Sequence, residues 1–247
     1  MPIRGARVRV LTGASGFSYP AWKGTFYPGN LPASRMLASY AERLAAVEIN
    51  ATFYRMPKPQ TLAVWRAAVG PEFCFALKAP QRITHVGRLS EVGDLVAHFY
   101  RVAAELGPLL GPVLFQLPPA FRKDLARLRD FLALLPPGGL SAFEFRHVSW
   151  FSDDVFETLA LQGAALCITD TEEARSPLLA TAGFGYLRLR AGVYAKAALR
   201  DWGERILAMP WRAAYVFFKH EDEARGPAYA LALREVLGEA APAQLTP

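Results

Sequence analysis

The feature that most constrains this chain is a regular alternation between short apolar segments and longer helical patterns. Eight segments of five to seven residues are rich in β-branched and aromatic residues, as buried strands are. They are RVRVLTG (7–13), AAVEIN (45–50), FCFALK (73–78), PVLFQL (112–117), SAFEFR (141–146), ALCITD (165–170), YLRLR (186–190) and AYVFFK (214–219). Eight strands that alternate with helices predict an α/β fold, a single parallel (β/α)8 barrel of the TIM type. A doubly wound open sheet is the alternative.

Apolar residues at three- and four-residue spacing indicate helices between these strands. Examples are ASRMLASYAERLAA (33–46), TLAVWRAAV (61–69), EVGDLVAHFYRVAAELG (91–107), FRKDLARLRDFLALL (121–135) and ALREVLGEA (232–240). The connection at 171–185 has the weakest helical pattern, because it contains Pro177 and two glycines. No linker or low-complexity tract divides the chain, and 52% of its residues are hydrophobic, so residues 1–247 are expected to form one domain.

The composition also limits where the protein acts and what it binds. No apolar run reaches the roughly 20 residues that cross a bilayer, and the N-terminal segment has no hydrophobic signal-peptide core, so we expect a cytoplasmic protein without a membrane partner. Cys74 and Cys167 each lie alone in an apolar segment, which indicates buried, reduced thiols. The net charge of +6 is only a weak indication of nucleic-acid binding, because the arginines are scattered. The oligomeric state is left open.

Polar residues inside the apolar segments can be placed by strand parity, because successive side chains point to opposite faces of a strand. In the second segment Val47 and Ile49 face the helices, which directs Glu48 and Asn50 towards the barrel axis. The same alternation directs inward Lys78, Gln116, Glu144, Arg146, Arg188, Arg190 and Lys219, and Asp170 ends the sixth segment. These residues gather towards the C-terminal ends of the strands, where barrel enzymes build their active sites.

The charges of this predicted pocket favour an anionic ligand. The cations are Lys78, Arg146, Arg188, Arg190 and Lys219, the carboxylates are Glu48, Glu144 and Asp170, and the balance is 5 − 3 = +2. Arginine binds phosphate or carboxylate groups through two parallel hydrogen bonds. A glutamate beside cations can act as a base, and a lysine beside other cations can act as a base or a nucleophile. Carboxylates that only orient the arginines are the structural alternative.

A catalytic metal is less favoured, and no cofactor is predicted. The three carboxylates and a histidine could form an oxygen-rich site for a divalent ion. The sequence, however, contains no HExxH, paired-histidine or DxD-type motif, and the neighbouring lysines and arginines oppose a further positive charge.

The loop GFSYPAWKGTFYPG (16–29) is unusually dense in aromatic residues, among them Tyr19 and Trp22. Such rings could stack on a ring-bearing ligand or a nucleic-acid base. They could equally pack together as a small hydrophobic lid over the barrel mouth. Both interpretations remain open on the sequence.

Several long motifs resemble the YecE-like family, known as domain of unknown function number seventy-two. In chain order they are GASGFSYPAWKGTFYPG, VEINATFYRMP, FALKAPQRITH, LFQLPP, FEFRHVSW, CITD and YLRLRAG. The resemblance implies a TIM-type barrel and leaves the activity open. It places the family pattern on Gly13, Ser15, Tyr19, Trp22, Tyr27, Pro28, Glu48, Asn50, Phe53, Tyr54, Lys78, Thr84, His85, Gln116, Glu144, Arg146, Trp150, Asp170 and Arg188.

Two positions depart from this family pattern. Many members have arginine-x-histidine-glycine on the seventh strand, and here Arg190 stands in place of the histidine. Many end the eighth strand with paired asparagines, and here Lys219 and His220 follow. Both departures add positive charge, so a neutral or metal-binding role is not carried over to these positions.

The sequence thus predicts an enzyme that uses acid/base chemistry, of hydrolase or lyase type, on a small anionic molecule in the barrel mouth. The predicted catalytic residues are Glu48, Lys78, Glu144 and Asp170. The predicted ligand-binding residues are Asn50, Tyr54, His85, Gln116, Arg146, Arg188, Arg190, Lys219, Tyr19 and Trp22. A nucleic-acid processing or binding protein and a non-catalytic ligand-binding barrel are the alternatives.

Overall fold

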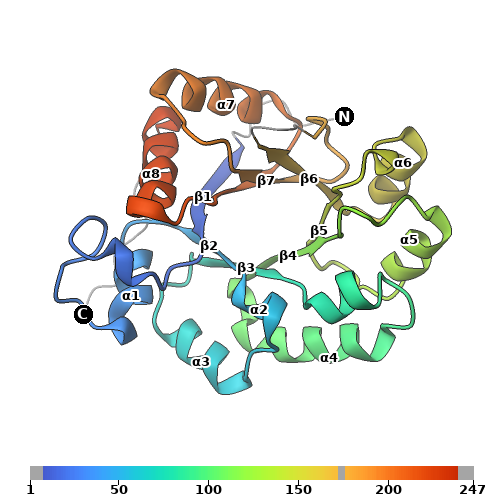
Figure 1. The fold of residues 1–247 in the computed structure, drawn as a ribbon, viewed down its shortest axis with the longest axis horizontal. Coiled ribbons are helices and arrows are strands. Elements are labelled where there is room, and N and C mark those ends of the chain that lie inside the picture. The colour runs from blue at the N-terminus through green and yellow to red at the C-terminus, as the bar shows by residue number, and fades with distance from the viewer. Residues whose placement is uncertain (1–7, 172–175, 239–247) are drawn as a thin grey trace.

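The computed structural model describes residues 8–171 and 176–238, which form a closed barrel of eight parallel strands (Figure 1). The strands are β1 (Arg9–Ser15), β2 (Ala46–Ile49), β3 (Cys74–Lys78), β4 (Leu110–Gln116), β5 (Ser141–Glu144), β6 (Ala165–Asp170), β7 (Phe184–Leu189) and β8 (Ala213–Phe218). They pair in sequence order, and β8 closes the ring against β1. The predicted segments agree with these strands to within two residues at either end, except that residue 7 lies outside the described residues.

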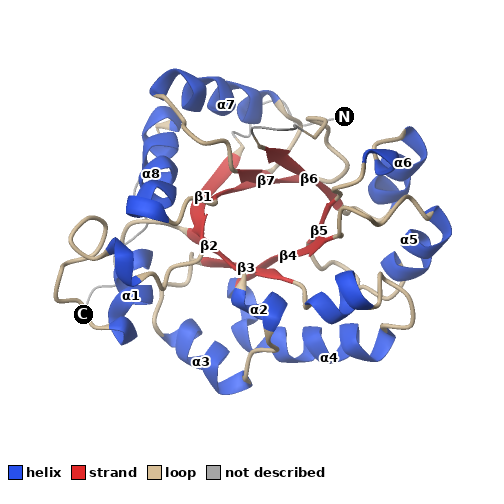
Figure 2. Cartoon of the chain, in the orientation of Figure 1, coloured by secondary structure: helices blue, strands red, loops and turns tan. Residues whose placement is uncertain are grey.

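Helices surround the barrel on its outer side (Figure 2). They are α1 (Met36–Ala41), α2 (Ala51–Tyr54), α3 (Pro59–Ala67), α4 (Gly93–Ala103), α5 (Leu125–Leu132), α6 (Asp153–Leu161), α7 (Lys196–Ala208) and α8 (Arg225–Leu237). Residues 176–183, in the connection between β6 and β7, contain no helix, as expected from the weak helical pattern around Pro177. The end of the last predicted helix, residues 239–240, lies outside the described residues.

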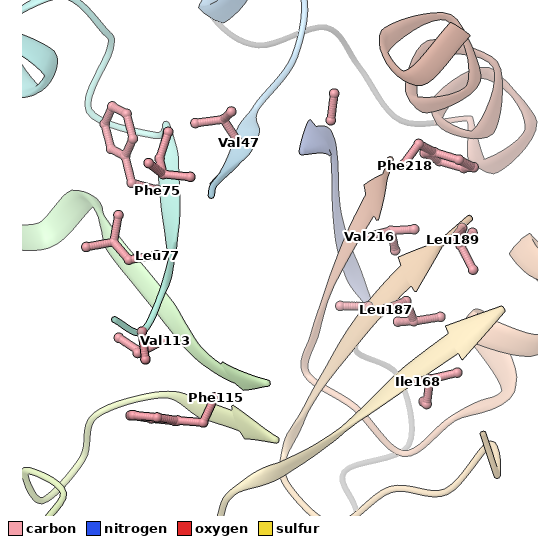
Figure 3. Close-up of a cluster of buried hydrophobic side chains, with 14 of the residues drawn as sticks. Val47, Phe75, Leu77, Val113, Phe115, Ile168, Leu187, Leu189, Val216 and Phe218 are labelled. Atoms are coloured by element: carbon pink, nitrogen blue, oxygen red, sulfur yellow. The ribbon is translucent and has the colours of Figure 1, made fainter. Parts of the chain in front are cut away.

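The two faces of the barrel wall carry separate apolar clusters, as strand parity predicts. The outer cluster packs the strands against the helices, and Figure 3 shows members of it: Val47, Phe75, Leu77, Val113, Phe115, Ile168, Leu187, Leu189, Val216 and Phe218. The inner cluster fills the barrel: Leu11, Ala46, Cys74, Ala76, Leu114, Ala142, Ala165, Cys167, Phe184, Tyr186 and Phe217. The barrel interior is therefore a packed core, and any ligand site must lie above it.

Strands β1 and β2 approach closely at Gly13. A Cβ atom at this position would lie 2.0 Å from the carbonyl oxygen of Ala46, so no larger residue fits without moving the strands apart. The Tyr40 hydroxyl bridges the two strands here, because it accepts a hydrogen bond from the Ala14 N–H at 2.7 Å and donates one to the Ala46 carbonyl at 2.9 Å. A side chain thus completes the backbone hydrogen bonding between β1 and β2.

We expect Tyr40→Phe to lower the free energy of unfolding by about 1–3 kcal/mol, because two buried backbone groups lose their partner. Urea unfolding would measure the change. Tyr54→Phe is the matched control, since Tyr54 is 73% exposed and should tolerate the substitution. Equal stability of the two variants would contradict a bridging role for Tyr40.

Candidate functional site

A layer of polar side chains lies inside the barrel, directly above the inner apolar cluster. Five of its members follow an inner-cluster residue by two positions. The pairs, apolar residue first, are Ala46 and Glu48, Ala76 and Lys78, Leu114 and Gln116, Ala142 and Glu144, and Tyr186 and Arg188. Since alternate residues of a strand share a face, these five point inward at the C-terminal ends of their strands. All five are buried, and the least covered, Lys78, is 8% exposed.

Arg188 joins Glu48 and Glu144, and so connects β7 with β2 and β5. Its Nε lies 2.9 Å from Glu48 Oε2, and its Nη2 donates to Glu48 Oε1 at 3.0 Å. Its Nη1 donates to Glu144 Oε2 at 2.5 Å. The guanidinium thus binds one carboxylate through two nitrogens and the other through its third, which fixes its plane and position.

Neutral donors occupy the remaining positions on both carboxylates. Glu48 accepts hydrogen bonds from Ser15 Oγ at 2.6 Å and from the Tyr186 hydroxyl at 2.7 Å, and Asn50 Nδ2 approaches it at 3.4 Å. Glu144 accepts from Gln116 Nε2 at 2.8 Å. The predicted inward position of Asn50 and Gln116 is confirmed by these contacts.

The same contacts keep both carboxylates ionised. Burial alone would raise the pKa of Glu48, but Arg188 and the hydrogen bonds from Ser15 and Tyr186 outweigh it and hold the pKa below its usual value. The pKa of Glu144 is also lowered, because Arg188 and Arg190 outweigh the effect of burial. Carboxylates with depressed pKa values and occupied oxygens are weak bases, so this geometry favours the interpretation in which they orient arginine.

Lys78 belongs to the same layer but stands apart from this network. Its Nζ makes no hydrogen bond or ion pair with any residue that the structure describes, and it lies 3.8 Å from the centroid of the Phe53 ring. Burial, with the nearby charges of Arg188 and Lys219, lowers the pKa of Lys78 to about 8, although Glu48 and Glu144 oppose the shift. A sizeable fraction of the amine is therefore neutral near physiological pH.

Helix α2 brings the Phe53 ring to this lysine. The chain enters α2 directly after β2, and the Thr52 hydroxyl contacts the carbonyl of Lys78 at 2.6 Å and that of Ile49 at 3.0 Å. The side chain of Thr52 thus fixes the start of α2 against the ends of β2 and β3. This contact explains why Phe53, four positions beyond the end of β2, can lie over the end of β3.

His85 lies on the same aromatic ring. It belongs to a π-helical turn, Arg82–Val86, and such turns are frequent at functional sites. Its ring meets Phe53 edge to face at 4.9 Å between centroids, and its Nδ1 lies 2.9 Å from Thr84 Oγ1. Burial, Lys78 and Arg146 lower the pKa of His85, so its imidazole is mainly neutral at pH 7. Lys78 and His85 therefore both contact Phe53, and burial and neighbouring cations lower the pKa of each.

Further cations lie at the rim of the layer. Arg190 is 20% exposed, its Nη2 lies 3.4 Å from Glu144 Oε1, and its buried Nε has no partner among the described residues. Arg146 and Lys219 are exposed to solvent. With Lys78 and Arg188 these residues make five cations against the two carboxylates of the layer, a balance of 5 − 2 = +3.

The third predicted carboxylate, Asp170, lies on the other side of the barrel wall. It shares a face of β6 with Leu166 and Ile168, which belong to the outer cluster, and it accepts a hydrogen bond from the Tyr194 hydroxyl at 3.0 Å. Strand parity places it there, because it follows Ile168 by two positions. The structure therefore does not bring Asp170 together with Glu48 and Glu144.

The aromatic residues of the first loop pack against their neighbours rather than facing solvent. Trp22 is 1% exposed, and its Nε1 donates to the Glu221 carbonyl at 2.7 Å. Tyr19 is half-buried, stacks on Trp22 at 4.6 Å between centroids and donates to the Ser15 carbonyl at 2.9 Å. Tyr54, in α2, is 73% exposed. The aromatic feature that had favoured nucleic-acid binding is therefore engaged in packing.

Three residues of the site were not among the predicted site residues: Ser15, Phe53 and Tyr186. Tyr186 could have been found, because it precedes Arg188 by two positions and must share its inward face. Ser15 lies opposite Glu48 in the register of β1 and β2, and this pairing was not predicted from the sequence. The contact between Phe53 and Lys78 depends on the turn into α2, which strand parity does not determine.

Within residues 8–171 and 176–238, no three His, Cys, Asp or Glu side chains come together in a way that could hold a metal ion. The expectation of no metal or cofactor stays a prediction. Across the same ranges, no helix is both long and apolar enough to cross a membrane.

The family described as "Protein of unknown function DUF72" matches residues 11–247 of this chain. Among curated proteins, the UPF0759 protein YecE of Escherichia coli (strain K12) is 35% identical over 117 residues. The aligned region covers 47% of this chain and 43% of that relative, less than half of its length.

Solved structures of DUF72 proteins show the same architecture. One from Thermotoga maritima MSB8 is 24% identical, has a TM-score of 0.78 and is covered completely by 94% of this chain. Another, from Enterococcus faecalis V583, is 19% identical, has a TM-score of 0.76 and is covered completely by 96% of this chain. At these identities the likeness confirms the predicted TIM-type barrel and nothing about activity. Since the family match extends over nearly the whole sequence, the chain belongs to the DUF72 family.

Proposed function

We propose that this protein is an enzyme that carries out acid/base chemistry on a small anionic molecule bound at the barrel mouth. The observation that carries the proposal is the Lys78 amine, which is buried beside two carboxylates and yet paired with neither. A buried, unpaired lysine destabilises a fold, and such perturbed groups concentrate at functional sites. Its position at the C-terminal end of a barrel strand is where enzymes of this fold place catalytic groups.

The roles of the surrounding residues follow from their contacts. Lys78 supplies the reactive amine, as a base or a nucleophile, because its pKa of about 8 leaves neutral amine available near pH 7. His85, whose ring also contacts Phe53, serves as the second proton-transfer group. Glu48 and Glu144 hold Arg188 in place, and the fixed guanidinium keeps positive potential directed at Lys78.

The excess of positive charge supports an anionic ligand. Arg190 carries a guanidinium that is only partly used by Glu144, and its buried Nε has no partner among the described residues. Lys219 and Arg146 add two exposed cations at the rim. Guanidinium groups bind phosphate and carboxylate through paired hydrogen bonds, so either anion fits this arrangement.

Inorganic phosphate should raise the melting temperature of the protein by mass action, and Arg190→Gln should weaken its binding about tenfold, since one charge-assisted contact is lost. Titration calorimetry and thermal unfolding would give the affinity. Arg205→Gln, on the surface of α7, is the matched control and should bind phosphate like the wild type. If phosphate, sulfate and pyruvate all fail to bind, or if Arg190→Gln binds them unchanged, the proposed anion site is wrong.

A further inference from the structure

We infer that the Lys78 amine is a nucleophile that forms an imine with the carbonyl carbon of an anionic carbonyl compound. This inference rests on the proposed function, because it uses the same anion site and names the substrate class that the site would take. Carbonyl compounds that carry a carboxylate or a phosphate, such as 2-oxo acids and phosphorylated ketones, have the required chemistry.

The first support is the way in which the charges of the layer are paired. Arg188 contacts both Glu48 and Glu144, and Ser15, Tyr186 and Gln116 donate to the positions that remain. A lysine with a purely structural task would pair with one of these carboxylates. Because Arg188 takes both, the Lys78 ammonium has no direct ion pair, and Glu48 and Glu144 oppose the lowering of its pKa only in part.

The second support is the surroundings of the amine. The Phe53 ring lies 3.8 Å from Nζ and shields one side of it from water, while the side chain keeps 8% of its surface exposed. A partly desolvated amine near other cations is the arrangement that activates lysine towards carbonyl groups. The pKa of Lys78 is about 8, and the ordinary value is 10.5. At pH 7.5 the neutral fraction of the Lys78 amine is therefore on the order of a hundred times that of an exposed lysine.

The third support is a proton-transfer group beside the amine. The neutral amine attacks the carbonyl carbon, a C–N bond forms as the C=O π bond breaks, and the nitrogen passes one proton through His85 to the oxygen, which becomes a hydroxyl. The nitrogen then passes its second proton through His85 to this hydroxyl, which leaves as water when the C=N bond forms. The net change is amine plus carbonyl to imine plus water, and no oxidant or reductant is required. Thr84 holds Nδ1 of His85, and Nε2 has no partner among the residues described, so Nε2 would carry this proton.

The fourth support is the charge of the product. A protonated iminium at this position adds positive charge to a layer that already has a surplus, which disfavours it unless an anion is bound beside it. A carboxylate or phosphate on the substrate compensates this charge through Arg190 and Lys219. A neutral aldehyde lacks that compensation and should react more slowly.

Reductive trapping tests the inference. The full-length protein is incubated separately with pyruvate, dihydroxyacetone phosphate and propionaldehyde in the presence of cyanoborohydride, and peptides are mapped by mass spectrometry. One of the two anionic compounds should label Lys78 at least tenfold faster than the exposed lysines Lys23, Lys58 and Lys196, and at least tenfold faster than propionaldehyde does. The labelling rate should rise with pH, and the midpoint of this rise should lie near pH 8.

Variants separate the nucleophile from the fold. Lys78→Met and Lys78→Arg should both lose this adduct, and Lys196→Met, at the start of α7, should keep it. Lys78→Met should unfold at a higher urea concentration than the wild type, since it removes a buried ammonium. If Lys78→Met fails to fold, the distribution of adducts and the pH midpoint of labelling in the wild type still show whether Lys78 is the nucleophile.

Two outcomes would overturn the inference: no adduct on Lys78 with either anionic compound, or adducts spread evenly over the lysines. The phosphate titration distinguishes this failure from failure of the proposed function. Phosphate that binds through Arg190 without any trapping on Lys78 would leave the anion site standing and remove only the imine. If excess phosphate slows the trapping at Lys78, the result would support both the anion site and the imine.

Discussion

Arg188→Met should lower the free energy of unfolding by about 3–5 kcal/mol, because it leaves two buried carboxylates without their cation. Glu48 and Glu144 are fully buried, and Arg188 bridges them. In the variant, each carboxylate must either remain charged in a medium of low polarity or take up a proton from water. Either outcome costs free energy, and neither arises in the folded wild type, where Arg188 pairs with both carboxylates. Urea unfolding at pH 7, followed by circular dichroism, would measure the loss.

A rescue experiment separates this cause from the loss of packing. Adding Glu48→Gln and Glu144→Gln to Arg188→Met removes the unpaired charges and should restore most of the stability, since neutral replacements of buried ion networks are often tolerated. Arg205→Met, which breaks an exposed pair with Asp201 on α7, should cost less than about 1 kcal/mol. If the triple variant were no more stable than Arg188→Met, the lost packing of the long side chain would explain the effect instead.

Arg188 also links the stability of the barrel to the chemistry proposed for it. Its charge is one of the causes that lower the pKa of Lys78. The Arg188→Met variant should therefore shift the pH midpoint for trapping at Lys78 upward wherever enough folded protein remains. Arg188 thus positions Glu48 and Glu144 and also helps to keep the Lys78 amine neutral.

Strand parity explains why so much of the barrel could be predicted. Each strand of a parallel barrel is covered on both faces, and an inward polar residue is conspicuous among apolar neighbours, as Glu48 is between Val47 and Ile49. The rule also gives the direction of the side chain without knowledge of the turns. Glu48, Glu144 and Arg188 were placed inward on this ground alone, and the structure brings them into one network.

The rule gives no direction for residues that lie beyond strand ends. Asp170, the last residue of β6, obeys the rule and falls on the outer face with Ile168, so its predicted place beside Glu48 and Glu144 rested on its position at the strand end and not on parity. Trp22 and Tyr54 lie in a loop and a short helix, where burial depends on contacts such as the one from Trp22 to Glu221. Side-chain geometry also decides that Arg188, and not Lys78, pairs with the two carboxylates. The absence of an ion pair at Lys78 could therefore not be predicted from the sequence.

Acid should destabilise this protein through the same two carboxylates. The folded pKa values of Glu48 and Glu144 lie below the usual 4.5, so their contribution is complete above pH 4.5 and is lost as the pH falls towards the folded values. Below pH 4.5 each carboxylate binds a proton on unfolding, which lowers the free energy of unfolding by up to about 1.4 kcal/mol per pH unit. Together they should contribute about 2.7 kcal/mol per unit.

The triple variant without Arg188, Glu48 and Glu144 provides the matching measurement, because it lacks both titrating groups. Its free energy of unfolding, followed by urea titration between pH 5 and 3, should fall less steeply than that of the wild type by up to this amount, about 2.7 kcal/mol per pH unit. Glu72→Gln, which removes an exposed carboxylate paired with Arg9, should leave the wild-type slope nearly intact. Equal slopes for the triple variant and the wild type would mean that other carboxylates govern acid unfolding. A smaller slope in the triple variant alone would assign the acid sensitivity to the buried network that holds Arg188 below the barrel mouth.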